Sequence, residues 1–153
     1  MNPRFQAFVK QLEPKFQQLI WMDPVKVTSL PRYMPTAGIY VFYEEGNPLY
    51  VGRTNRMKQR IRYHSRESAD DAPFAFRLAR EATGYTKATY RKKGSRKDLL
   101  STSQFREAFA EAKARTREMD IRFIEESDHI KQALLEIYTA VVLDTPYNDF
   151  KTH

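Results

Sequence analysis

The chain has 153 residues, of which 41% are hydrophobic, and it carries a net charge of +7 without a single cysteine. This length suits one compact domain with a modest core. No apolar run approaches the roughly 18 residues of a membrane span, and residues 1–10 lack the continuous apolar stretch of a secretory signal. We therefore expect a soluble, cytoplasmic protein of one domain, 1–153, with no membrane association.

The composition also restricts metal binding. Without cysteine, disulfides and thiolate-bound metals are excluded. The three histidines, His64, His129 and His153, are too scattered to predict a zinc cluster. Any bound metal is expected to have oxygen ligands.

The positive charge is concentrated in two short segments, which hold 12 of the 26 Lys and Arg residues. The first, which contains no acidic residue, comprises Arg53, Arg56, Lys58, Arg60, Arg62 and Arg66, and the second comprises Lys87, Arg91, Lys92, Lys93, Arg96 and Lys97. Clustered cations favour a polyanionic partner, although composition does not separate DNA from RNA or an acidic membrane surface. Each segment could equally be a solvated face.

The first 36 residues predict an N-terminal helical extension. Apolar residues recur at helical spacing over 4–20, and Pro14 is expected to divide this stretch into two short helices. Pro24, Pro31 and Pro35 then predict an irregular segment before the first strand.

Residues 37–66 predict a hairpin followed by a helix. The stretch 37–43 is rich in β-branched and aromatic residues, 44–48 supplies turn residues, and 49–52 resumes the strand pattern. A helix is expected over about 56–66, with Met57 and Ile61 on its inner face. Arg60 and His64, four residues apart, then share another side of this helix.

The rest of the chain predicts more helices and one further strand. Residues 67–118 form a helical and basic insertion, with helices over about 73–82 and 104–119 and a basic loop over 84–97. Residues 121–125 alternate apolar and charged residues as an edge strand would. Ser127 or Asp128 is then expected to cap a helix that runs to about Leu143.

Two tyrosines on the hairpin are candidates for chemistry. Hydrolysis of a phosphodiester needs a base, a cation near the phosphorus and stabilisation of the departing oxygen. If Tyr40 and Tyr50 project from the same face of the hairpin, their hydroxyls could converge. The alternative is that they are amphipathic sheet residues, as most strand tyrosines are.

Two polar residues near the end of the chain are further candidates. Glu136 has Ala133 and Ala140 one turn away on either side, which leaves room for a hydrated cation beside its carboxylate. One carboxylate plus waters suits Mg²⁺ or Mn²⁺. Alternatively, Glu136 is a boundary residue or an ion-pair partner, and Asn148 is a turn residue.

Five elements in order resemble the signature of the GIY-YIG nuclease superfamily: Gly38-Ile39-Tyr40, Tyr50-Val51-Gly52, Arg60 with His64, Glu136, and Asn148. Val51 stands where the second signature has isoleucine. The resemblance covers 37–66 and 121–150. It implies an α+β fold, with a small central three-stranded antiparallel sheet flanked by helices, to which 1–36 and 67–118 are additions.

The resemblance also implies roles for these residues. Tyr40 would act as, or position, the base that activates water, with Tyr50 bonded in the same pocket. Glu136 would hold one divalent cation, and Arg60 would neutralise the phosphate and favour the phenolate of Tyr40. His64 would assist Tyr40 or contact the phosphate, and Asn148 would orient Tyr40 or a phosphate oxygen.

The leading hypothesis is therefore a metal-dependent endonuclease that cleaves DNA, with the two basic segments on the phosphate backbone. RNA is not excluded as a partner, and the enzyme could act as a homodimer or be recruited by another protein. A non-catalytic nucleic-acid-binding protein on a nuclease-like fold is the first alternative. A basic structural or RNA-associated protein is the second.

Overall fold

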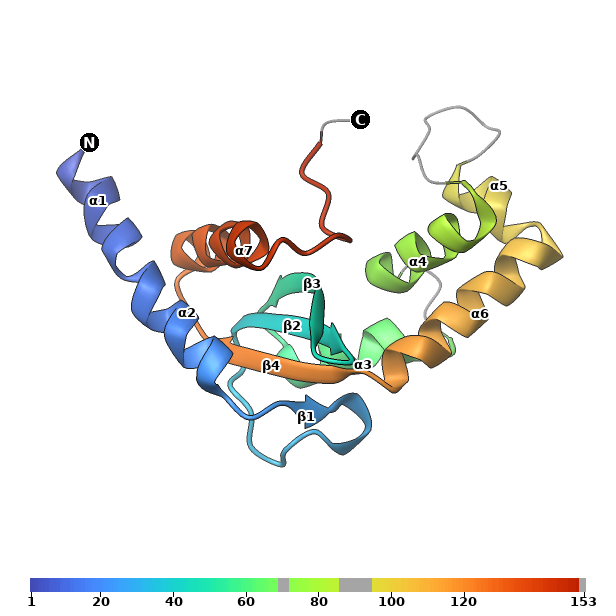
Figure 1. Cartoon of the computed structure of the whole chain (residues 1–153), viewed down its shortest axis with the longest axis horizontal. Helices are drawn as coiled ribbons and strands as arrows, with labels where there is room; N and C mark the ends of the chain where they lie inside the picture. Colours follow the sequence, from blue (N-terminus) through green and yellow to red (C-terminus); the bar gives the residue numbers. More distant parts are fainter. Residues whose placement is uncertain (69–71, 86–94, 152–153) are drawn as a thin grey trace.

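A computed structural model describes residues 1–68, 72–85 and 95–151 (Figure 1). Its elements are, in chain order, α1 (Pro3–Lys10), α2 (Leu12–Trp21), β1 (Val25–Lys26), the 3-10 helix η1 (Val27–Ser29), β2 (Gly38–Glu44), β3 (Asn47–Thr54), α3 (Met57–Ser65), α4 (Pro73–Thr83), α5 (Arg96–Leu100), α6 (Ser103–Arg117), β4 (Asp120–Glu125) and α7 (His129–Leu143). Within these ranges, no helix is both long enough and apolar enough to cross a bilayer.

The α+β class is confirmed, but the antiparallel sheet has four strands in the order β1-β4-β2-β3, not three. The additional strand, β1, pairs Val25 with Ile121 of β4. Two residues are too few to show an alternating pattern, and β1 lies in the proline-rich segment predicted to be irregular. Because β1 covers its outer side, β4 is an interior strand, and the prediction of an edge strand was wrong.

The hairpin turns more tightly than the sequence suggested. Glu45 and Gly46 alone form the turn, and both have positive φ angles, 51° and 81°, as a type I′ turn requires. Asn47 and Pro48, predicted to be turn residues, begin β3. Since β3 is the outermost strand, the missing N–H of Pro48 is tolerated there.

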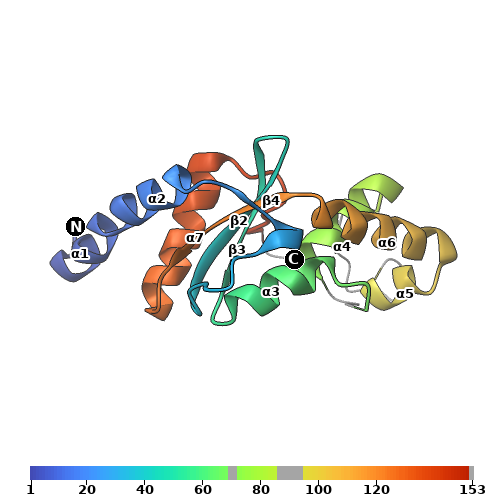
Figure 2. The ribbon, with the colours of Figure 1, turned by 90° about the horizontal axis from the view of Figure 1, so that it is seen from below.

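Helices cover both faces of the sheet (Figures 1 and 2), and the side chains of β2 alternate between the two cores. Ile39, Val41 and Tyr43 pack in one core with residues of α2 and α7. Tyr40 and Phe42 pack in the other core with residues of α3, α4 and α6. The helix that carries Glu136 therefore lies on the opposite face of the sheet from Tyr40.

Several helix boundaries differ from the prediction. The break between α1 and α2 falls at Gln11, because Pro14 sits in the first turn of α2, where its missing N–H costs no helical hydrogen bond. Asp128 caps α7 as predicted, accepting hydrogen bonds from the backbone N–H groups of Ile130 and Lys131.

The second basic segment is only partly described. Arg96 and Lys97 are not in a loop but in α5, which Ser95 caps by accepting a hydrogen bond from the Asp98 N–H. The other cations of that segment, Lys87, Arg91, Lys92 and Lys93, lie outside the described residues.

Candidate active site

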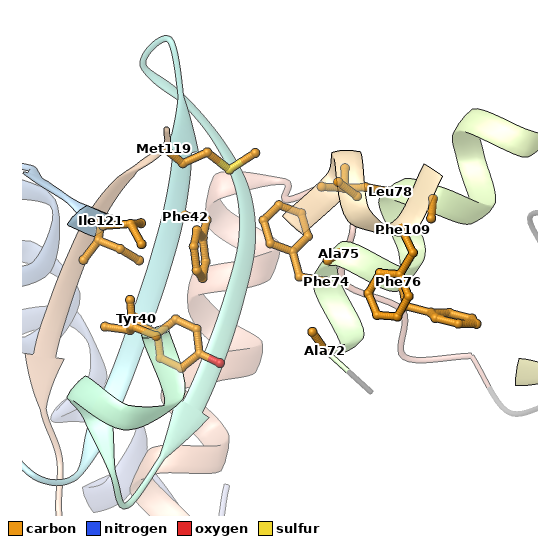
Figure 3. Close-up of a cluster of buried hydrophobic side chains, with 14 of the residues drawn as sticks. Tyr40, Phe42, Ala72, Phe74, Ala75, Phe76, Leu78, Phe109, Met119 and Ile121 are labelled. Carbon is orange, nitrogen blue, oxygen red and sulfur yellow. The ribbon is translucent and has the colours of Figure 1, made fainter. Parts of the chain in front are cut away.

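Tyr40 reaches the outer strand of the sheet because its cross-strand partner is a glycine. Tyr40 is paired with Gly52 of β3, and a β-carbon at Gly52 would overlap Cζ and Oη of the Tyr40 ring. The ring therefore lies across the bare backbone of Gly52. Figure 3 shows Tyr40 and Phe42 projecting from β2 toward the side where Phe74 of α4 lies. Gly52, the glycine of the second signature, is thus required because the Tyr40 ring approaches its backbone closely.

The Tyr40 hydroxyl is hydrogen-bonded to His64 in the protein interior. Its oxygen lies 2.6 Å from Nε2 of His64, and the two residues are only 1% and 0% exposed. Burial, reinforced by the charge of Arg60, lowers the pKa of His64 to about 3, so the imidazole is neutral at pH 7. The bond places His64 directly against Tyr40, and its burial leaves it no solvent-facing atom to contact a phosphate.

Tyr50 converges on the same imidazole from the neighbouring strand. Its ring centroid lies 5.5 Å from that of His64, and its other contact is a parallel stack on Phe74 at 4.8 Å. Burial raises the pKa of Tyr50, while the charge of Arg77 on α4 opposes the shift. Phe74 and Arg77 escaped the sequence analysis, because an apolar residue and a cation on an amphipathic helix carry no distinguishing signal.

Arg60 lies beside the Tyr40 hydroxyl. Its guanidinium carbon is 5.2 Å from the centroid of the Tyr63 ring, and its charge lowers the pKa of Tyr40. Arg60 therefore acts in the predicted direction, toward the phenolate. Burial has the larger, opposite effect, so the pKa of Tyr40 is well above its ordinary value of 10.0 and the phenol is protonated in this state of the protein.

Glu136 of α7 lies against the outer strand β3. Its half-buried carboxylate lies 3.2 Å from Nε of Arg53, a residue of β3. Burial raises the pKa of Glu136, and the Arg53 charge opposes this. The Glu136 charge in turn raises the pKa values of both Tyr40 and Tyr50. Glu136 therefore influences the ionisation of both tyrosines from α7, the helix that covers the other face of the sheet.

Asn148 acts on the backbone of β3. Its amide donates a 2.8 Å hydrogen bond to the Val51 carbonyl and accepts one of 2.8 Å from the Val51 N–H. Thr145 donates a further hydrogen bond to the same Oδ1 at 2.8 Å. We predicted that Asn148 orients Tyr40 or a phosphate oxygen. Instead, its side chain takes the place of a neighbouring strand and fixes β3 between Tyr50 and Gly52.

The cations of α3 lie around this site. Arg56, Arg62 and Arg66 are exposed, whereas Lys58 is partly covered and donates a 2.9 Å hydrogen bond to the carbonyl of Arg32. Arg53, also in the first basic segment, forms an ion pair with Glu136. The outer surface of α3 is therefore strongly basic next to Arg60.

Comparison with known proteins identifies the family of the chain. The family model described as the GIY-YIG catalytic domain matches residues 36–139, which is more than half of the chain. The protein therefore belongs to the GIY-YIG family, whose catalytic domain is a nuclease domain, and a nucleic acid is its implied substrate. No curated protein and no solved structure gives a significant match.

Proposed function

We propose that this protein is a metal-dependent endonuclease that hydrolyses DNA phosphodiester bonds at a site formed by Tyr40, Arg60 and Glu136. The observation that supports this most strongly is the buried hydrogen bond between Tyr40 and His64, placed over a glycine that no other residue could replace without moving the phenol. A buried tyrosine hydroxyl needs a hydrogen-bond partner in any case, so the support for chemistry is that this partner is an imidazole and that the Arg60 charge lowers the pKa of the same phenol.

The hydrogen-bonding capacity of His64 indicates how Tyr40 is used. In the described part of the chain, Nδ1 of His64 is buried without a hydrogen-bond partner. The neutral imidazole either donates from Nε2 to the Tyr40 oxygen or accepts the phenol proton there, depending on its tautomer. The charge of Arg60 acts on the same phenol and lowers its pKa.

A hydrogen bond donated by His64 and the charge of Arg60 would both stabilise the phenol oxygen when it becomes negative. In the free protein, burial keeps Tyr40 protonated. Ionisation, with loss of the phenol proton to solvent, would therefore depend on the positive charge of a bound cation, since the substrate itself is an anion. As the water oxygen bonds to phosphorus and the bond to the departing sugar oxygen breaks, Tyr40 then accepts a proton from the water and the departing oxygen takes one from solvent. His64 holds the phenol oxygen, and the guanidinium of Arg60 neutralises the phosphate.

Glu136 is the residue that would hold the cation. Among the described residues, no three His, Cys, Asp or Glu side chains converge on one point. A single half-buried carboxylate fits a Mg²⁺ or Mn²⁺ ion, which keeps several of its waters, and Arg53 would give up its present partner. Such an ion supplies a Lewis acid for a phosphate oxygen and offsets negative charge in the site.

Cleavage assays with purified protein test this proposal. Linear, branched and single-stranded DNA would be incubated with Mg²⁺ or Mn²⁺, and with chelator, beside the variants Glu136→Ala and Glu107→Ala. Glu107 is an exposed glutamate on α6, so it controls for loss of a carboxylate elsewhere. We expect cleavage by the unmodified protein and by Glu107→Ala only, and only with metal.

Three results would contradict the proposal in different ways. Cleavage in the presence of chelator would show that no metal is needed. Cleavage by Glu136→Ala would show that Glu136 is not a required metal ligand. DNA binding without cleavage under all conditions would favour a non-catalytic nucleic-acid-binding protein.

A further inference from the structure

An exposed tyrosine stands on the loop between η1 and β2. Tyr33 is 84% exposed, and in the described part of the chain its hydroxyl forms no hydrogen bond. The guanidinium carbon of Arg32 lies 5.5 Å from the centroid of the Tyr33 ring. Folding therefore does not account for this aromatic ring, which presents a face to solvent beside a cation.

The loop that carries Tyr33 is held firmly at both ends. Leu30 and Met34 pack against the core that contains Tyr40, and Pro31 and Pro35 each fix one backbone angle. The loop is also tied to the start of α3, because the Met57 N–H donates a 2.9 Å hydrogen bond to the Thr36 carbonyl.

The side chain of Lys58 adds a second tie, to the Arg32 carbonyl at 2.9 Å. An aromatic ring on such an anchored loop loses little conformational freedom when a ligand stacks on it.

The surroundings indicate the chemistry of that ligand. No acidic residue occurs in 30–37 or in 53–66, while Arg32, Lys58 and the exposed Arg56 supply positive charge. Exposed aromatic rings beside cations are the elements with which proteins bind unpaired bases, since every base has a face to stack and every nucleotide a phosphate. Arg32 occupies one face of the Tyr33 ring and leaves the other for a base.

The position of Tyr33 relative to the candidate active site follows from α3. The buried face of α3 contains Met57, Ile61 and His64. At 3.6 residues per turn, Lys58 and Arg60 fall on opposite sides of that face. The Lys58 side and the Arg60 side of α3 are therefore separated by about the width of a helix with its side chains, 10–12 Å. This distance corresponds to roughly three stacked nucleotides at 3.4 Å each.

We propose that Tyr33, together with Arg32 and Lys58, forms a stacking site for an unpaired base about three nucleotides from the phosphate bound at Arg60. The protein would then act on DNA that has a single-stranded segment beside the cleaved bond. This proposal rests on the function proposed above, because it is Arg60 that fixes where the cleaved phosphate lies.

Binding measurements test the stacking site without requiring cleavage. The full chain with Glu136→Ala would be titrated, by fluorescence anisotropy, with a blunt duplex and with the same duplex extended by a single strand. Tyr33→Ala, Tyr33→Phe and Trp21→Ala would be compared in this background. Trp21 is the matched control, since it is 81% exposed but lies at the end of α2, where its indole N–H is bonded to Gln17.

We expect Tyr33→Ala to weaken binding of the extended DNA by about 5- to 150-fold, the range typical for loss of one stacked base. Binding of the blunt duplex should not change, and Tyr33→Phe and Trp21→Ala should bind both DNAs normally. A fluorescent adenine analogue moved along the single strand should be quenched most strongly about three nucleotides from the cleavage point, and only when residue 33 is aromatic.

The proposal is overturned if Tyr33→Ala weakens binding of both DNAs equally, or of neither, or if Trp21→Ala has the same effect. If the unmodified protein cleaves DNA but its binding is independent of Tyr33, the stacking site fails alone. If it never cleaves DNA while the selective loss in Tyr33→Ala persists, the nuclease proposal fails and a base-stacking site remains.

Discussion

Tyr40→Phe is expected to separate the chemistry of this site from its stability. The change removes the one hydrogen bond that His64 Nε2 makes, and Nδ1 of the same imidazole already has no partner among the described residues. A buried imidazole without any hydrogen bond destabilises the folded state by about 1–3 kcal/mol. In a chain of this length, that lowers the melting temperature by roughly 2–12 °C.

A double-mutant cycle makes the prediction quantitative. His64→Leu replaces the imidazole by an apolar side chain of similar size. In Tyr40→Phe/His64→Leu, both partners of the bond are then apolar, which can be nearly neutral for stability. We expect a coupling energy of about 0.5–3 kcal/mol between the two positions, measured by chemical denaturation of the four proteins.

Cleavage should follow a different pattern from stability in the same four proteins. Tyr40→Phe and the double variant should both lack cleavage, because neither has the phenol oxygen, although the double variant regains stability. DNA affinity should change little in either. An unchanged melting temperature in Tyr40→Phe would show that the buried bond does not exist, and near-normal cleavage by that variant would remove Tyr40 as the base.

Two further predictions concern acid stability and the glycine of the second signature. The pKa of His64 is about 3 in the folded protein, against an ordinary 6.5. As the pH falls, the unfolded chain therefore binds the proton first. The stability of the fold is retained above pH 6.5 and decreases as the pH drops toward 3. The slope from this group is at most ~1.4 kcal/mol per pH unit, and denaturation curves of His64→Leu should lack it; equal slopes in both proteins would contradict the assignment. Gly52→Ala should displace the Tyr40 ring, destabilise the fold by about 1–3 kcal/mol and lower cleavage as far as Tyr40→Phe does. Full activity in Gly52→Ala would show that the close approach is not required.

The local parts of the site could be predicted because they depend on short-range periodicity. Tyr40 and Tyr50 were assigned to two arms of a hairpin, and the structure places both against His64. The helix of Arg60 and His64 followed from apolar spacing within a single turn, but the prediction that the two share a side away from Met57 and Ile61 was wrong, because His64 lies on the buried face with them. The type of turn was harder to predict, because Glu45 adopts a positive φ angle that is uncommon for glutamate.

The other wrong predictions concern contacts between distant segments. β1 contributes only two residues, so its existence depends on β4, nearly a hundred positions later. Phe74 stacks on Tyr50 because α4 packs over the hairpin, which no pattern within α4 reveals. Asn148 looked like a turn residue or a catalytic one, and its bonds to Val51 depend on where the chain returns after α7.

The amino-acid sequence by itself determined which chemical groups this protein has and the order in which it presents them, since residue types and their spacing in a strand or helix are properties of neighbouring positions. Only the tertiary structure decided that Glu136, on a helix that covers the other face of the sheet, pairs with Arg53 and raises the pKa values of both tyrosines. It also decided that Tyr40 is a protonated phenol and His64 a neutral imidazole. The physical reason is that burial and charge, which set these protonation states, are supplied by side chains far away in the chain.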